Sequence, residues 1–137
     1  RNAMKRLVKA PKVHYLDVGV LRAVLQKSDN LNGHEFESAI VAEIFKQVKV
    51  ADVEVSFYHL RTSDGREVDL LIETEHGYIS IEIKMSEKVR SVDARNLRGL
   101  DAILDKPVLH QFVISNDLSI SDLGDGIRAI PAVQFLT

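Results

Sequence analysis

The stretch that decides the fold is EVDLLIETEHGYISIEIK, residues 67–84. In its second arm, Tyr78–Lys84, every second residue from position 79 is an isoleucine, the period typical of a half-buried strand. In its first arm, Glu67–Ile72, apolar residues likewise occupy the even positions. Gly77 supplies a turn signal between the arms. The pattern therefore predicts a β-hairpin.

The charged residues of this hairpin depend on its register. If the loop has an even number of residues centred on Glu75 and His76, Asp69 faces Glu82 and Glu67 faces Lys84. The Cβ atoms of opposed residues lie about 5 Å apart, and two carboxylates placed there destabilise a sheet unless a divalent cation lies between them. A loop of odd length would instead turn Asp69 toward the isoleucine face.

An upstream helix carries a third acid. Its apolar stripe has helical spacing and consists of Phe36, Ile40, Val41, Ile44, Phe45 and Val48. At about 100° per residue Glu37 projects into this stripe, whereas Glu35 points away and Glu43 lies toward its border. A carboxylate directed at a core must be paired, protonated or metal-bound. An ion pair with a basic residue of the sheet remains the alternative to a metal site.

Asp69, twelve intervening residues and then Glu82-Ile83-Lys84, preceded by a helix carrying Glu37, resembles the PD-(D/E)XK nuclease superfamily. Val68 occupies the place of the proline that commonly precedes the motif aspartate. The resemblance implies an α/β fold of the restriction-endonuclease type, with a mixed central sheet flanked by helices.

The same resemblance implies a set of site residues. Glu37, Asp69 and Glu82, with the backbone carbonyl of Ile83, are expected to bind Mg²⁺ or Mn²⁺. Lys84 is expected to orient the attacking water and to offset developing charge, so that Asp69, Glu82 and Lys84 form the catalytic set.

Four ordered motifs look like the C-terminal domain of unknown function found in many prokaryotic AAA-type ATPases. They are Pro11–Val20, Phe36-Glu37 with Ala42-Glu43, Phe57–Asp69 and Ile81–Lys84. The resemblance implies that residues 4–137 form one domain that follows an ATPase module in a larger ATP-binding protein. No phosphate-binding loop of the Walker type occurs here, so no ATP site is expected in this chain. Residues 1–3 are interpreted as a tag remnant.

The rest of the chain is consistent with an α/β domain whose last helix is a crossover between parallel strands. The expected elements are a strand Val13–Leu16, a helix Val18–Leu25 capped by Asp17, a strand Val53–Leu60, a turn Ser63–Gly65, a helix Val89–Leu104, a strand Leu109–Ile114, a loop Asn116–Gly126 and an extended piece Ile127–Ile130. In the helix Val89–Leu104 the residues expected to face inward are Val92, Leu97, Leu100, Ile103 and Leu104.

Composition limits the classes of protein to which the chain can belong. The chain has 137 residues, 45% of them hydrophobic and 28% charged, which fits one soluble domain. The absence of cysteine excludes disulfides and cysteine-rich zinc sites. No apolar run reaches the ~20 residues of a membrane span and no signal peptide is visible, so a cytoplasmic location is expected. The five histidines are scattered and suggest no metal pair.

A net charge of −2 does not point to nucleic acid, but local positive charge does. The candidate nucleic-acid contacts, with DNA the expected partner, are Arg61, Arg66, Lys88, Arg90, Arg95 and Arg98. A solvated surface explains the downstream residues equally well, and Arg61 and Arg66 could instead pair with Glu67 and neighbouring acids.

Metal-assisted hydrolysis of a phosphodiester is the function that the sequence favours. A noncatalytic module that keeps the nuclease fold for DNA binding or partner docking is the alternative. A self-standing endonuclease of the restriction or repair type should carry a target-recognition segment, and none is visible.

Overall fold

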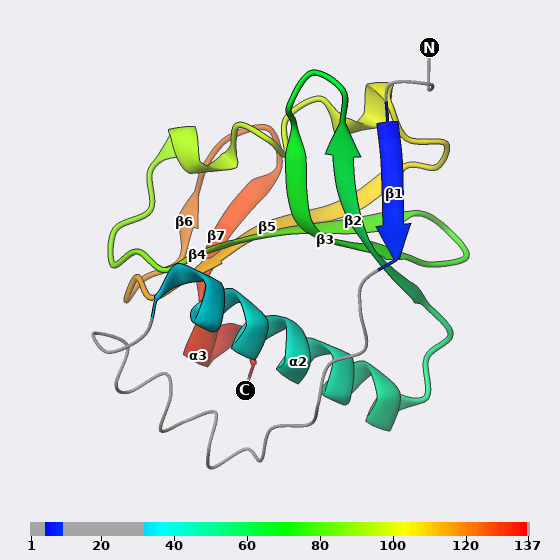
Figure 1. Cartoon of the computed structure of the whole chain (residues 1–137). Coiled ribbons are helices and arrows are strands. Elements are labelled where there is room, and N and C mark those ends of the chain that lie inside the picture. Colours follow the sequence, from blue (N-terminus) through cyan, green and yellow to red (C-terminus); the bar gives the residue numbers. More distant parts are fainter. Residues whose placement is uncertain (1–4, 10–31, 137) are drawn as a thin grey trace.

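In the computed structural model, residues 5–9 and 32–136 are described, and their strands form one seven-stranded sheet in the order β1-β2-β3-β4-β5-β7-β6 (Figure 1). The elements are β1 (Lys5–Lys9), α2 (Gly33–Ala51), β2 (Ser56–Thr62), β3 (Glu67–Glu73), β4 (Tyr78–Lys84), the 3₁₀ helices η3 (Ser91–Ala94) and η4 (Leu100–Ala102), β5 (Val108–Ser115), β6 (Ser121–Asp122), β7 (Ile127–Pro131) and α3 (Ala132–Phe135). The expected strand Val13–Leu16, the helix Val18–Leu25 and Asp17 lie outside the described residues.

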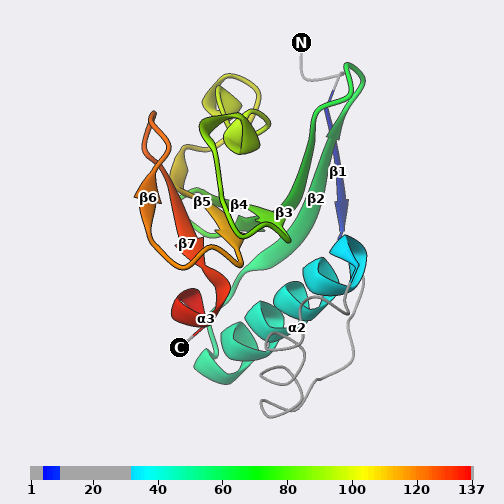
Figure 2. The same cartoon turned by 90° about the vertical axis from the view of Figure 1, so that its left-hand side faces the viewer.

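The sheet is mixed, which confirms the α/β class. Neighbouring strands from β1 to β4 are antiparallel, whereas β4, β5 and β7 run parallel. Helix α2 lies on one face of the sheet and the segment with η3 and η4 on the other (Figure 2). Each face has its own apolar cluster, one around Phe36 and Ile81 under α2, the other around Leu97 and Val113.

Most of the predicted strands are present with shifted ends. β2 begins at Ser56 rather than Val53, and β5 and β7 extend the predicted strands by a residue or two. The predicted loop from Asn116 to Gly126 contains the two-residue strand β6. β1 and α3 were not predicted. No helix in the described ranges is both long and apolar enough to cross a membrane.

Helix α2 begins with a capping box: Asn32 Oδ1 accepts the Glu35 N–H (2.8 Å), and the Glu35 carboxylate accepts the Asn32 N–H (3.0 Å). The predicted ranking of its acids was wrong. Glu43 is the buried one, only 4% exposed, whereas Glu37 is half-buried. Glu43 follows Phe36 by two helical turns and so shares its core face, while Glu37 is rotated about 100° from Phe36.

The hairpin register is the one that an even loop predicts. Leu70 lies opposite Ile81 and Ile72 opposite Ile79, and four residues, 74–77, connect the strands. The predicted strict alternation of buried and exposed side chains along β3 is wrong, however, because Val68 and Leu70 pack in different apolar clusters. The cause is a β-bulge, in which Asp69 and Leu70 of β3 together oppose His59 of β2.

The predicted helix Val89–Leu104 was also wrong. This crossover contains only η3 and η4, and Gly99 interrupts it in the left-handed region at φ 74°. Three of its leucines still face inward as predicted, namely Leu97, Leu100 and Leu104, whereas Val92 is 47% exposed. The segment is held by side-chain hydrogen bonds instead of a helical ladder, above all those of Arg98 to Asp125, Ser91 and Leu123.

The hairpin turn predicts a measurable stability effect at Gly77. A Cβ atom there would clash with the Pro107 carbonyl oxygen, which accepts the Tyr78 N–H (2.8 Å). Gly77→Ala should therefore lower the free energy of unfolding by roughly 1–3 kcal/mol in urea titrations, since backbone must move. Gly33→Ala is the matched control, because no described atom lies within 4 Å of that position and alanine favours a helix. Equal stabilities of the two variants would contradict this account.

Candidate functional site

Strands β3 and β4 diverge at the charged end of the hairpin, and we call this point of divergence the fork. Paired residues of β3 and β4 extend from Glu73/Tyr78 only as far as Leu70/Ile81. Beyond them the backbone N–H groups bind side chains: the Asp69 N–H donates to Glu82 Oε1 (3.1 Å), and the Ile83 N–H donates to Asp69 Oδ2 (2.8 Å). The two carboxylates thus replace the carbonyl acceptors of a continuing ladder, which satisfies both donors where the strands part.

Glu82 is an acid in an unfavourable environment. Its side chain is 9% exposed, and burial, reinforced by the Asp69 charge, raises the pKa of Glu82 from an ordinary 4.5 to about 8. The Asp69 N–H and the Asn96 side chain act in the opposite direction. At neutral pH this carboxyl group is therefore largely protonated unless a positive charge stabilises its ionised form.

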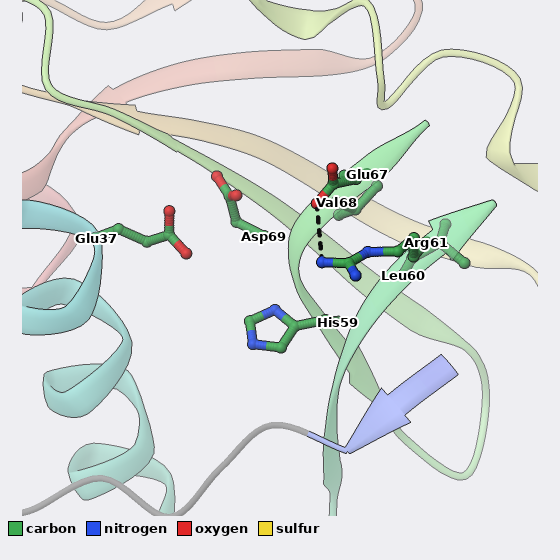
Figure 3. A pocket seen from close by; sticks show the side chains of 7 residues that line it. All are labelled: Glu37, His59, Leu60, Arg61, Glu67, Val68 and Asp69. Atoms are coloured by element: carbon green, nitrogen blue, oxygen red, sulfur yellow. Dashed lines mark hydrogen bonds and ion pairs between the residues drawn. The ribbon is translucent and has the colours of Figure 1, made fainter. Parts of the chain in front are cut away.

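Glu37 approaches Asp69 from helix α2. Figure 3 shows the two carboxylates directed toward one another across a pocket. Burial and then the Asp69 charge raise the pKa of Glu37, while His59 and His34 lower it. Asp69 is therefore the acid shared by both neighbours: its charge raises the pKa of Glu37 on one side and of Glu82 on the other.

The acids do not share one face of the sheet, as the hairpin pattern alone suggested. Glu82 and Lys84 alternate with the isoleucines that pack under α2, and so project toward the crossover segment, where Asn96 and Asp93 meet them. Glu37 lies on the α2 side, and Asp69 occupies the fork between the two. Among residues 32–136, no three histidine or acidic side chains are arranged to hold one metal ion.

Lys84 pairs differently from the prediction. The register would place it opposite Glu67, but β3 has left β4 at that level. The Lys84 Nζ lies 3.7 Å from Asp93 Oδ1, and Glu67 pairs instead with Arg61 at 3.4 Å. Because the Lys84 side chain is 43% exposed, its ammonium group can exchange this partner for a ligand.

A pocket of about 260 Å³ opens on the α2 side of the fork. Its lining, drawn in Figure 3, is Glu37, His59, Leu60, Arg61, Glu67, Val68 and Asp69. The sequence reasoning missed His59, because only the bulge places it opposite Asp69, and the spacing of residues along the chain carries no signal for that bulge.

The predicted nucleic-acid contacts divide into two groups. Arg66 and Arg98 are used structurally: the Arg66 guanidinium donates to the Arg98 carbonyl (2.9 Å), and Arg98 Nη1 lies 2.7 Å from Asp125 Oδ2. Arg95 reaches only the nearby Val92 carbonyl. Arg61, Lys88, Arg90 and Arg95 are exposed, and for all six residues a nucleic-acid contact stays a prediction.

The chemistry of the donor set fits a hard divalent cation. Three carboxylates, two of them with raised pKa values, meet in pairs at Asp69. The carbonyl of Ile83 belongs to the same stretch of β4 as Glu82. A cation would replace repulsion among these groups by attraction, although the described side chains are not arranged around a single ion and would have to move to share one.

Comparison with known proteins gives one family. A protein-family model described as Domain of unknown function (DUF4143) matches residues 32–135. Searches of curated proteins and of solved structures returned no match.

Proposed function

The chain belongs to the DUF4143 family, a domain of unknown function, and on that premise we propose that it is a divalent-cation-dependent nuclease domain with a PD-(D/E)XK fold. The observation that carries the proposal is the position of Asp69 between Glu37 and Glu82, at the point where two strands of the sheet diverge. Carboxylates with strongly shifted pKa values are concentrated at functional sites.

Electrostatics supports a cation at this place. The ionised forms of Glu37 and Glu82 are both disfavoured by burial and by the Asp69 charge. Acids with a purely structural role avoid such an arrangement unless a positive charge compensates it. Among the described residues, the nearby ammonium group of Lys84 already pairs with Asp93. Mg²⁺ or Mn²⁺ accepts the hard oxygen ligands that these side chains offer.

Each residue then has a defined part in phosphodiester hydrolysis. Glu37, Asp69 and Glu82, with the Ile83 carbonyl, would hold the cation, which supplies Lewis-acid polarisation of the phosphate and a more acidic water. Asp69 also orients the strand carrying Glu82 through the Ile83 N–H. The Lys84 ammonium donates to the attacking water or to a phosphate oxygen, where negative charge develops.

The direct test is cleavage by the purified domain. Supercoiled, linear and branched DNA are incubated with Mg²⁺, with Mn²⁺ and with a chelator, and products are separated on gels. Cleavage that needs the metal supports the proposal. No cleavage of any of these substrates, together with no heat of Mn²⁺ binding in calorimetry, would overturn it.

Lys84→Ala separates catalysis from metal binding. The variant should retain Mn²⁺ affinity within about threefold, because Lys84 is not a ligand, and should lose roughly 100-fold in cleavage rate at saturating DNA. Arg128→Ala, which removes an exposed positive charge from β7, is the control and should leave that rate unchanged. If Lys84→Ala lost metal affinity while keeping its rate, the assigned roles would be reversed.

A second candidate is a noncatalytic nuclease-fold module for DNA binding or partner docking. It is favoured by the Lys84–Asp93 ion pair and by the arrangement of Glu37, Asp69 and Glu82 in pairs rather than as one triad. Retained DNA binding without cleavage, and without any effect of metal, would select this module.

The wider setting belongs to the same proposal. We place the domain in the cytoplasm behind an AAA-type ATPase module, on the strength of the four sequence motifs that it shares with such C-terminal domains. DNA is the expected substrate and the ATPase the expected partner within one polypeptide.

A further inference from the structure

The bulge in β3 gives the pocket a second, basic wall. His59 opposes Asp69 and Leu70 across the bulge, and Arg61 stands two residues later on β2, on the same side of that strand. Both line the pocket together with Glu37 and Asp69. Figure 3 shows the His59 ring and the Arg61 guanidinium across the pocket from the Glu37 carboxylate.

Two polar groups facing this pocket have unused hydrogen-bonding capacity. Within the part of the chain that the structure describes, neither the Glu37 carboxylate nor the His59 imidazole makes a hydrogen bond or an ion pair, and Figure 3 draws none for them. Arg61 is held loosely, 3.4 Å from Glu67 with 65% of its side chain exposed. Its guanidinium can therefore accept a second partner at little cost.

The pocket is thus divided by charge. Glu37 and Asp69 form an acidic wall next to the proposed cation position, and His59 and Arg61, the latter paired with the exposed Glu67, form a wall of N–H donors. A cation on the acidic wall neutralises it, after which the donors opposite favour an anion. The pocket, of about 260 Å³, has room for a small anionic group such as a phosphodiester.

We propose that His59 and Arg61 bind a phosphodiester group of a nucleic-acid strand in this pocket, beside the acids at the fork. The inference rests on the proposed function for the identity of the ligand. His59 acts as a hydrogen-bond donor through its ring N–H, and Arg61 as a bidentate donor to two phosphate oxygens. This assigns His59 to the site and gives Arg61 a specific contact.

The test is the affinity of the whole domain for a fluorescein-labelled single-stranded DNA oligonucleotide, measured by fluorescence anisotropy. Titrations contain Ca²⁺, a hard cation that carboxylates accept. His59→Phe removes the donor and keeps the ring shape, whereas His59→Gln restores an N–H donor. We expect His59→Phe to raise Kd roughly 3- to 10-fold, the effect of one lost hydrogen bond. Arg61→Ala should raise Kd by at least roughly 10-fold, because two charge-assisted hydrogen bonds are lost.

Arg128→Ala is the matched control, since Arg128 is exposed on β7, three strands away from β3. It and His59→Gln should bind within about twofold of the wild type. Wild-type affinity in both His59→Phe and Arg61→Ala would overturn the inference, as would failure of the wild type to bind the oligonucleotide. Because Arg61 is exposed, its substitution tests the pocket even if His59→Phe does not fold.

The outcome is distinguishable from that of the proposed function. Cleavage that depends on Asp69 but not on His59 or Arg61 would leave the nuclease standing and remove the phosphate pocket. Binding that depends on His59 without any metal-dependent cleavage would do the reverse, and would support the pocket in a noncatalytic module.

Discussion

Asp69→Asn is expected to lose Mn²⁺ binding and, with it, at least about 100-fold of the metal-dependent cleavage rate. The substitution removes the charge shared by Glu37 and Glu82. It also keeps an oxygen acceptor for the Ile83 N–H, which Asp69 now binds at 2.8 Å. Asp69→Ala would strand that buried N–H and cost roughly 1–3 kcal/mol of stability, so the amide is the sharper variant.

The same variant has a readout that does not involve activity. Burial raises the pKa of both Glu37 and Glu82, and the Asp69 charge adds to the effect, so removing that charge should lower both pKa values part of the way toward the ordinary range of glutamate. Carboxyl carbon chemical shifts followed by NMR across a pH titration would measure this. If the pKa values of Glu37 and Glu82 were the same in Asp69→Asn as in the wild type, the Asp69 charge would not be what links these two acids.

Glu67→Gln is the control for Asp69→Asn. Glu67 lines the same pocket two residues away, but its carboxylate pairs with Arg61 and is largely exposed. It should leave Mn²⁺ affinity and the cleavage rate nearly unchanged. Equal losses in both variants would mean that the general negative charge of the pocket, rather than ligation by Asp69, governs the metal.

Much of this geometry could be predicted because it follows from short-range periodicity. Alternating isoleucines with a turn at Gly77 determine the hairpin and its register, and the stripe beginning at Phe36 determines helix α2. Both patterns act through burial of one face, which a sequence displays directly. The candidates Asp69, Glu82 and Glu37 were found for that reason.

The rest depends on tertiary contacts that periodicity does not encode. The β3 bulge moves Asp69 into the fork and brings in His59, although the sequence there still alternates. The crossover was predicted as a helix because its leucines are spaced like a helical stripe, yet Gly99 and the hydrogen bonds of Arg98 fix an irregular path. The partners of Lys84 and Glu67 changed because β3 and β4 separate before reaching them.

Glu82 should make the stability of the wild type fall as pH rises. Its pKa is about 8 in the folded protein and near 4.5 when unfolded, so its contribution is fully present below pH 4.5 and is lost as pH rises through 8. The loss should reach a few kcal/mol, because ionised Glu82 would be buried beside Asp69. The free energy of unfolding of the wild type and of Glu82→Gln would be measured in urea between pH 5 and pH 8.5. The difference between the two proteins at each pH isolates the contribution of Glu82.

Glu82→Gln should match the wild type at the acid end of this range and exceed its free energy of unfolding at the alkaline end, because glutamine keeps an acceptor for the Asp69 N–H without a charge. Mn²⁺ should restore the stability of the wild type at pH 8.5, since ionised Glu82 then gains a positive neighbour, and should do little for the glutamine variant. Parallel stability curves for the two proteins would mean that Glu82 stays ionised throughout. The acids at the fork would then lack the electrostatic repulsion that makes a bound cation favourable. That result would favour the noncatalytic module over the nuclease.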